Sequence, residues 1–203
     1  MQSLPLPIFP IDSKPCGLTY SEWSTKWWQW LLSIPKSNNP AFDSTGNYAN
    51  VNQNDPNVFF LCQTIESVAS VPNRTITLPA NRSIFMPIIN WISTLHKDGE
   101  TDREMIAIAK ERMDVVANLE VTINGTTIKE GLEKYRAQSP FFDIILPEDN
   151  IVEVPAGPTR CISDGYWIFL KPLPGTYDIR TAGSCLSGRI TINVMLHLDI
   201  KAM

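Results

Sequence analysis

The residues best suited to a specific contact in this chain are aromatic side chains that also carry a polar edge. The 203-residue sequence contains six Trp and five Tyr residues. An indole or phenol offers a flat apolar face beside an N–H or O–H group, which suits contact with a carbohydrate or a protein surface. The residues that we expect to bind a ligand are Trp28, Tyr48, Asp164, Tyr166 and Trp167. The competing interpretation is that most of the Trp residues fill the core.

A second set of candidates could hold a metal ion. His197 and Asp199 lie two residues apart on one face of a predicted strand, where they could share a metal or a proton. A third ligand is missing from this pattern, and a surface histidine beside a carboxylate is ordinary. A further alternative is a calcium site in which Asp164 joins Glu148 and Asp149, although the spacing of an EF-hand is absent.

The sequence contains none of the short motifs that mark common catalytic or nucleotide-binding sites. G-x-S-x-G, G-x-G-x-x-G, the Walker sequence and C-x-x-C are all missing. Paired carboxylates are present, but their spacing does not show whether any two face each other. This favours a protein that is not an enzyme and needs no cofactor.

The cysteines allow one structural prediction. The strands that end at Leu170 and begin at Thr176 are joined by K-P-L-P-G. If these strands form an antiparallel hairpin, the register places Cys161 opposite Cys185, and a disulfide could close there. A bulge would shift that register, and a reducing compartment would leave the thiols free. Cys62 lies in an apolar run and is expected to be an inert core thiol.

Two capping boxes predict two amphipathic helices. Thr19 with Glu22 begins a helix over about 20–33, and Thr101 with Glu104 begins one over about 102–116. Helical spacing predicts that the first helix buries one arc of residues, namely Tyr20, Trp23, Trp27, Trp30, Leu31 and Ile34. Trp28 lies outside this arc, so its role needs a separate explanation.

The remaining patterns are typical of strands. Short apolar runs predict strands near 58–62, 74–78 and 84–89, and Pro87 within the third predicts an edge or a bulge. Asn124-Gly125 predicts a hairpin turn. In the last segment, apolar residues alternate from Ile190 to Ile200, which predicts a strand with one wet face. We therefore expect a mainly β fold, an antiparallel sandwich of jelly-roll type with the two helices added.

The chain is expected to form a single domain over 1–203. Residues 1–18 contain four prolines and are expected to form an extended arm. Residues 35–57 are rich in Asn, Pro, Asp and Ser, which predicts a long surface loop. A loop of this length is either functional or packed by its own aromatic residues, Phe42 and Tyr48.

Charge and hydropathy exclude several classes of partner. The net charge is -4, and the cations are scattered, so nucleic acid and an anionic membrane surface are not expected partners. No apolar run is long enough for a transmembrane segment. The first residues lack the pattern of a signal peptide, which predicts a cytoplasmic protein if Met1 is the native start; otherwise a secreted or cell-surface location stays open.

Several motifs together resemble a known family. They are W-x-x-x-W-W-x-W at 23–30, L-P-A-x-x-x-I-F-x-P-I-I-N at 78–90, Q-S-P-F-F-D at 138–143 and S-D-G-Y-W-I-F-L-K-P-L-P-G at 163–175. The chain resembles an uncharacterised family of archaeal and bacterial proteins, many of them exported. That family has no known activity, so the resemblance implies no catalytic residues.

The function expected from the sequence is non-enzymatic binding of a glycan or a protein surface through exposed aromatic residues. One alternative is a metal-dependent hydrolase that uses His197, Asp199 and nearby carboxylates. Another is a structural homo-oligomer in which Trp28 and the N-terminal arm bridge subunits.

Overall fold

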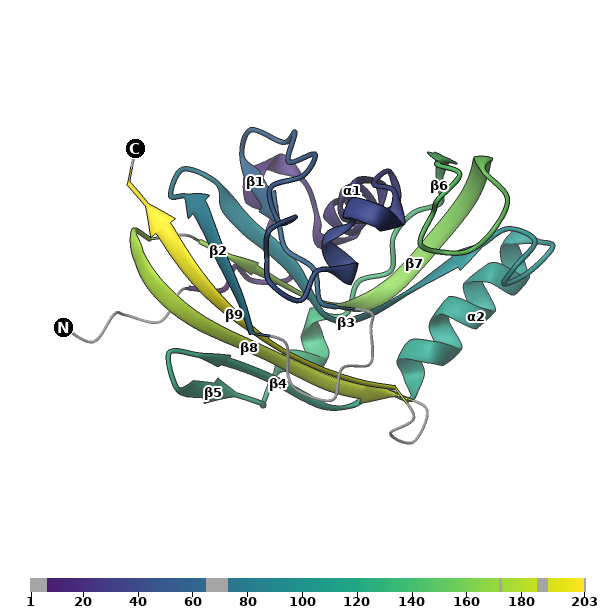
Figure 1. Ribbon diagram of the computed structural model, residues 1–203. Coiled ribbons are helices and arrows are strands. Elements are labelled where there is room, and N and C mark those ends of the chain that lie inside the picture. Colours follow the sequence, from purple (N-terminus) through teal and green to yellow (C-terminus); the bar gives the residue numbers. More distant parts are fainter. Residues whose placement is uncertain (1–6, 65–72, 172, 186–189, 203) are drawn as a thin grey trace.

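Nine strands form two sheets, and two helices pack against them, in a computed structural model that describes residues 7–64, 73–171, 173–185 and 190–202 (Figure 1). The four-stranded sheet has the order β1-β3-β7-β6, and the five-stranded sheet has the order β2-β9-β8-β4-β5. The strands are β1 (Val58–Phe60), β2 (Asn73–Pro79), β3 (Ser83–Thr94), β4 (Ala117–Ile123), β5 (Thr126–Ile128), β6 (Phe142–Leu146), β7 (Gly157–Leu170), β8 (Gly175–Cys185) and β9 (Ile190–Lys201). The predicted mainly β fold with two helices is confirmed.

Both sheets are mixed, so the expectation of a purely antiparallel, jelly-roll-like sandwich is corrected. β1 runs parallel to β3, and β2 runs parallel to β9, while the other pairs are antiparallel. Neither parallel pair joins strands that are consecutive in the chain. Alternation of apolar residues predicts that a strand exists but does not specify the direction of its neighbour.

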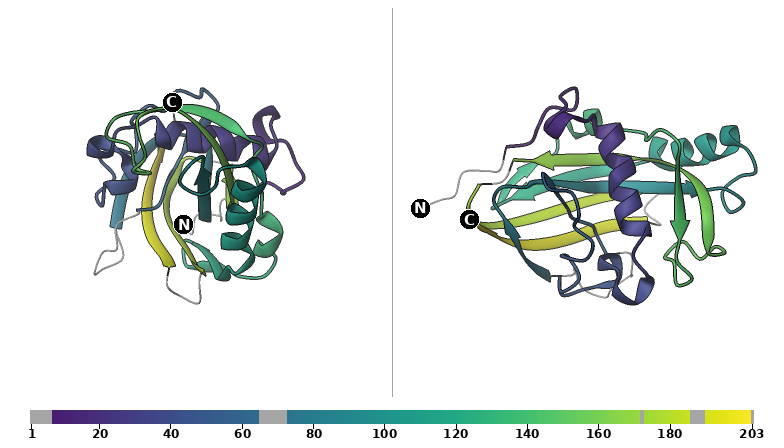
Figure 2. Two further views of the ribbon diagram at one scale, coloured as in Figure 1. Left: turned by 90° about the vertical axis from the view of Figure 1, so that its right-hand side faces the viewer. Right: turned by 90° about the horizontal axis from the view of Figure 1, so that it is seen from above.

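Both predicted helices begin at their capping boxes. α1 (Tyr20–Leu32) follows Thr19, and α2 (Asp102–Asp114) follows Thr101; in each, the cap hydroxyl accepts from the N3 amide and the N3 glutamate accepts from the cap amide. α1 crosses the strands of the four-stranded sheet (Figure 2). α2 packs on β3 and β7 through Met105 and Ala109. Four short 3-10 helices lie in the connections: Pro15–Gly17, Lys36–Asn38, Pro40–Phe42 and Leu132–Tyr135.

The four-stranded sheet is buried on both faces. On β7, Trp167 and Phe169 pack with α1, while the alternate residues Ile168 and Leu170 pack against the five-stranded sheet. A strand covered on both sides reads as a continuous apolar run, which explains G-Y-W-I-F-L. The five-stranded sheet buries one face only.

The last strand matches its predicted pattern. Val194, Leu196, Leu198 and Ile200 are buried in the core between the sheets, and Ile192 packs against that core while partly buried. The side chain of Ile190 is outside the described residues. The hairpin of β4 and β5 is also confirmed, because Asn124 and Gly125 both have positive φ angles, 49° and 79°.

The predicted hairpin across K-P-L-P-G is wrong. β7 pairs with β3 and β6, whereas β8 pairs with β4 and β9, so the two strands belong to different sheets. Cys161 is therefore opposite Thr94 and Phe142, and Cys185 is opposite Ile190. The predicted Cys161–Cys185 disulfide is absent, and both residues carry free thiols.

The connections before β1 are more buried than expected. Within 35–57, Asn39 is fully buried and its side-chain amide donates to the carbonyls of Leu31 and Ile34, which closes the end of α1. In the described part of the N-terminal arm, Phe9 N–H donates to the carbonyl of Phe169 at 2.8 Å. These segments cover the core of their own chain. Among the described residues, no helix has the length and apolar character needed to cross a membrane.

Candidate functional site

A cavity of about 460 Å³ lies beside β3 at the point where that strand changes register. Its walls come from α1, from Pro87 to Thr94 of β3, from the loops at 41, 63–64, 97–98 and 151–152, and from the ends of β8 and β9. Most of the wall is apolar. We call this cavity the bulge pocket. Its volume falls within the range of sites that hold small organic ligands.

The bulge of β3 creates the pocket, and Pro87 explains why the bulge occurs there. Pro87 is opposite Trp167, yet Ile89 is opposite Tyr166, so Ile88 is the extra residue. A proline has no N–H to donate to the ladder, and strands tolerate it at bulges for that reason. The predicted edge or bulge at Pro87 is thus confirmed as a bulge.

The side-chain amide of Gln63 holds the bulge in place. Its Nε2 donates to the carbonyl of Pro87 at 3.2 Å, to the carbonyl of Ile88 and to Thr181 Oγ1 at 3.1 Å. Gln63 is 7% exposed. A buried amide thus donates to both carbonyls at the irregular part of the strand.

The six indole N–H groups divide into two classes. Those of Trp23, Trp27, Trp30 and Trp167 donate to the backbone carbonyls of Pro15, Leu61, Val51 and Ala137. Those of Trp28 and Trp91 are buried and have no hydrogen-bond partner among the residues that the structure describes. Trp28 and Trp91 both line the bulge pocket.

A third unpaired donor belongs to the same wall. Asn90 lies next to Trp91 and lines the pocket, and its buried Nδ2 has no hydrogen-bond partner in the described part of the chain. Leaving a buried donor unpaired costs about 1–3 kcal/mol, and native proteins contain few such groups. Three of these groups belong to residues that line one cavity.

Packing fixes the rings that carry two of these donors. Trp28 is 6% exposed and meets Trp27 edge to face at 4.9 Å between ring centroids. The guanidinium of Arg112 lies 4.9 Å from the ring centroid of Trp91. The backbone beneath Asn90 is also tightly packed, because a Cβ added to Gly165 would lie 2.6 Å from the Cβ of Asn90. The donors therefore stand on rigid supports.

Two charged residues lie at the edge of the pocket. Lys97 Nζ donates to the carbonyl of Val152 at 2.6 Å and so ties the 151–152 loop to the wall. Asp98 accepts hydrogen bonds from the backbone N–H and hydroxyl of Thr94, at 2.9 and 3.2 Å. Both side chains are anchored by contacts within the chain.

A fully buried arginine lies behind the wall. Arg74 is 1% exposed; its Nη1 donates to the carbonyl of Cys62 at 2.5 Å and its Nη2 to that of Pro40 at 3.1 Å. The chain neighbours of these two residues, Gln63 and Ala41, line the bulge pocket. Arg74 Nε has no hydrogen-bond partner within the described ranges. Burial raises the pKa of the Cys62 thiol, which agrees with the predicted inert core cysteine.

The residues predicted from sequence to bind a ligand have different positions. Trp28 lines the bulge pocket and is buried, although helical spacing placed it outside the buried arc. Trp167 is fully buried and stacks on Phe85, with 5.0 Å between centroids and 8° between ring planes. Tyr166 is 8% exposed, and Tyr48 is 39% exposed on its loop. The structure brings none of the other four to the pocket wall.

Asp164 forms a buried ion pair. Its side chain is 3% exposed and accepts from Arg136 Nη2 at 2.7 Å and from Arg136 Nε at 3.2 Å. This contact raises the pKa of Arg136, chiefly through the hydrogen bond to Asp164. Asp164 is part of β7 and lies opposite Trp91 of β3. Its carboxylate is thus occupied by a structural contact.

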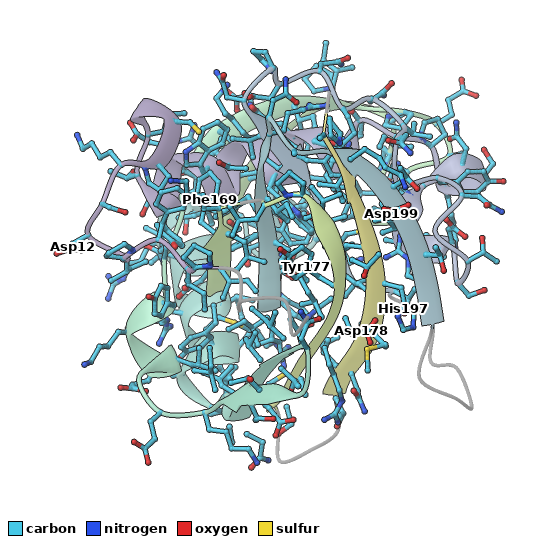
Figure 3. All side chains as sticks on the ribbon, turned by 90° about the vertical axis from the view of Figure 1, so that its left-hand side faces the viewer. Asp12, Phe169, Tyr177, Asp178, His197 and Asp199 are labelled. Carbon is cyan, nitrogen blue, oxygen red and sulfur yellow. The ribbon has the colours of Figure 1, made fainter. Side chains whose placement is uncertain are left out.

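The metal-site candidates are engaged elsewhere. Figure 3 shows His197 beside Asp178 of the neighbouring strand, with Asp199 farther along β9. His197 Nδ1 contacts Asp178 Oδ1, and Asp199 pairs with Lys201 at 2.5 Å. Asp149 Oδ2 accepts from the backbone N–H of Ser37. Among the residues that the structure describes, no three His, Cys, Asp or Glu side chains gather to hold a metal ion.

A second cavity of about 470 Å³ lies between the polar side of α1 and the segment 52–56. Lys26, Gln29, Asn52 and Asn54 line it. The indole of Trp30, which also lines it, already donates to Val51 at 2.9 Å. None of its lining residues has an unpaired buried side-chain atom, so the bulge pocket is the stronger candidate.

Comparisons with family models, with curated proteins and with solved structures gave no match. The resemblance to an uncharacterised prokaryotic family therefore stays a prediction.

Proposed function

We propose that this protein binds a small, largely apolar molecule in the bulge pocket and recognises a hydrogen-bond acceptor on it. The observation that carries the proposal is the division of the indoles: four donate to backbone carbonyls, and the two without a partner both line this pocket. A ligand oxygen that accepts from Trp28 or Trp91 would recover the hydrogen bonds that folding leaves unmade.

The chemistry of the wall narrows the kind of ligand. The unpaired side-chain amide and indole groups at Trp28, Asn90 and Trp91 are donors, so the ligand must present acceptors. The mainly apolar remainder of the wall favours a flat or aliphatic body over a sugar with many hydroxyl groups. This form of the binding function differs from the glycan or protein surface expected from sequence, and it needs no bound metal or cofactor.

Titration calorimetry with two probes of one shape tests the proposal. Naphthalene supplies only an apolar body, and naphthamide adds a carbonyl acceptor. We expect naphthamide to bind with one-to-one stoichiometry and more tightly than naphthalene. Absence of binding by any naphthalene derivative would contradict the proposal.

A pair of Trp variants locates the acceptor contact. Trp28→Phe keeps a ring in the wall but removes the indole N–H, so naphthamide affinity should fall about three- to tenfold, the value of one neutral hydrogen bond. Trp30→Phe is the matched control, because the N–H of Trp30 donates to Val51 at the other cavity. Equal affinities in both variants would argue against recognition by Trp28.

Filling the pocket provides a second check. Ile92 lines the bulge pocket, so Ile92→Trp should abolish naphthamide binding. The same change at Ile145, which is 75% exposed on β6, should leave binding unchanged. If both variants bind as the wild type does, the ligand occupies a different place.

A further inference from the structure

We propose that the ligand of the bulge pocket is a short apolar peptide that adds as an extended strand to the free edge of β3. This inference rests on the proposed function and names the class of molecule that the pocket takes. It follows from the direction of the backbone groups of β3, which the proposed function does not use.

Beyond the bulge, one edge of β3 has no strand beside it in the described part of the chain. β3 lies between β1 and β7, but β1 pairs with it only as far as Phe85. From Asn90 to Ile92 the strand is half-buried, between buried stretches on either side. All three of these residues line the bulge pocket, although their side chains point alternately to the two faces of the sheet. The pocket therefore lies along the free edge of the strand.

The backbone groups of Asn90 and Ile92 point to this free edge and not to β7. In an antiparallel pair, opposite residues alternate between exchanging both backbone hydrogen bonds and exchanging none. Leu95 N–H donates to the carbonyl of Arg160 of β7 at 3.0 Å. Counting back in steps of two, residues 93 and 91 bond to β7 as well, so Asn90 and Ile92 do not.

The residues opposite on β7 agree with this alternation. Ser163 lies opposite Ile92, and its backbone bonds away from β3: its N–H donates to Ser139 Oγ at 2.9 Å, and its carbonyl accepts from Ser139 N–H at 2.8 Å. Gly165 lies opposite Asn90. A Cβ added there would lie 2.6 Å from that of Asn90, which fits a pair without hydrogen bonds, where side chains approach most closely.

The backbone groups at the free edge are met at Thr94 but not at the two earlier positions. Thr94 N–H donates to Asp98 at 2.9 Å, and the Thr94 carbonyl accepts from the N–H groups of Lys97 and Asp98. Within the described ranges, the N–H and C=O of Asn90 and Ile92 have no such partners. Each residue presents one donor and one acceptor to the pocket, and an extended peptide presents the complementary groups at the same spacing.

The pocket walls also suit the side chains of an added strand, which point alternately to the two faces of the sheet. On one face the wall includes Trp28 and Leu31 of α1, which belong to the core beneath that helix. On the other face it includes Cys185 and Ile192, at the ends of β8 and β9. Because both walls are apolar, a peptide with consecutive apolar side chains buries one in each layer.

Amide-to-ester replacement tests this inference on the wild-type protein by titration calorimetry. The probe is a dileucine peptide with an acetyl group and a methylamide at its ends, and in each of two analogues an ester replaces the amide of one leucine. Successive N–H groups of a strand point to opposite sides. We therefore expect one ester to bind about three- to tenfold more weakly than the peptide and the other to bind equally well.

The outcomes separate this inference from the proposed function. Equal affinities for the peptide and both esters, or binding of naphthamide without binding of the peptide, would overturn the inference and leave the proposed function intact. Failure of naphthamide and of all three peptide probes to bind would overturn the proposed function itself.

Hydrogen exchange of the backbone amides locates the added strand. The N–H groups of Asn90 and Ile92 should exchange quickly in the free protein and slowly with the peptide bound. Those of residues 91 and 93 already bond to β7 and should be protected in both states. Equal protection of residues 90 to 93 in the free protein would mean that the edge is filled by the chain itself or by a second copy, and would overturn the inference.

A proline at position 92 removes one of the proposed donors. Ile92→Pro deletes an N–H that is not part of the ladder with β7, a place where strands tolerate proline. Ile92→Ala is the matched control, because it loses the same side chain but keeps the N–H. We expect the peptide to bind Ile92→Pro about three- to tenfold more weakly than Ile92→Ala. Equal affinities would overturn the inference, and if Ile92→Pro does not fold, the ester analogues decide.

Discussion

The side-chain amide of Gln63 donates to the carbonyl oxygen of Pro87 at 3.2 Å and so anchors the bulge of β3 that shapes the pocket. The same nitrogen also donates to Ile88 and to Thr181 of β8, a strand of the other sheet. One buried amide thus links the irregular strand to both layers of the fold. The position of the pocket donors Asn90 and Trp91 depends on that link, because they follow the bulge directly.

Gln63→Leu should therefore lower both stability and binding. The carbonyls of Pro87 and Ile88 would lose their donor inside the core, and we expect the free energy of unfolding to fall by about 2–3 kcal/mol. Urea denaturation measures this loss. Gln29→Leu on α1 is the control, with an expected change within about 0.5 kcal/mol, as for most surface substitutions. A loss at Gln63 no larger than that at Gln29 would refute the anchoring role.

Breaking the Arg136–Asp164 pair should lower stability more than breaking the contact between Arg136 and Asp114. Asp164→Ala leaves the guanidinium without its buried partner, and breaking such a pair costs about 3–5 kcal/mol. Asp114 contacts Arg136 Nη1 at 2.7 Å, but its side chain is 40% exposed, so Asp114→Ala should cost less than about 1 kcal/mol. Thermal unfolding measures the stability of both variants. Equal losses of stability would show that the burial of Asp164 does not make its contact with Arg136 the stronger one.

Asp43 should make folding sensitive to acid. Burial alone would raise the pKa of this carboxyl group. Hydrogen bonds from the Thr45 hydroxyl and from the amides of Tyr48 and Thr45 have the larger combined effect. The pKa is therefore lowered below its ordinary value of 3.8. A group with a lowered pKa in the folded state contributes stability above the unfolded pKa and loses it as pH falls through the folded pKa. Stability should therefore decline below pH 3.8.

Asp43→Asn isolates this contribution. The variant lacks the titrating group, so its stability should be lower at neutral pH and should decline less than that of the wild type below pH 3.8. Urea midpoints measured at several pH values give both slopes. Parallel curves for the two proteins would mean that Asp43 is not part of the acid response.

The four cysteines should react at very different rates. Cys16 is exposed, whereas Cys62, Cys161 and Cys185 are buried, and burial raises the pKa of Cys161 to about 12. Because the thiolate is the reactive form, a thiol reagent should label Cys16 first in the native protein and the other three only after unfolding. Mass spectrometry of the labelled peptides identifies each site. Detection of a Cys161–Cys185 cross-link would contradict the assignment of these two strands to different sheets.

Local sequence signals predicted the helices, strands and turns well, but they did not predict which distant strands pair. The capping boxes at Thr19 and Thr101, the Asn124-Gly125 turn and the alternation from Val194 to Ile200 act within a few residues, and the structure contains each. The K-P-L-P-G segment looked like a hairpin because nothing local shows that β7 and β8 each have two other partners. For the same reason, the two parallel pairs were not predicted.

The candidate site was only partly accessible to sequence reasoning. Pro87 predicted the bulge, and Trp28 was among the candidate residues. Helical spacing assumed one buried arc, whereas α1 also buries Ser24, Trp28 and Leu32. Gln63, Asn90, Trp91 and Arg74 carried no local signal. Their roles arise from which donors find an acceptor after folding, and a linear pattern does not contain that information.

Nuclear magnetic resonance of the indole N–H groups tests the central claim most directly. Trp→Phe variants assign the six signals, and naphthamide is then titrated into the labelled protein. The account predicts that the signals of Trp28 and Trp91 shift as new hydrogen bonds form, while those of Trp23 and Trp30 stay in place because they already donate to Pro15 and Val51. Unchanged Trp28 and Trp91 signals at saturating naphthamide, or equal shifts in all six, would contradict the proposed binding mode.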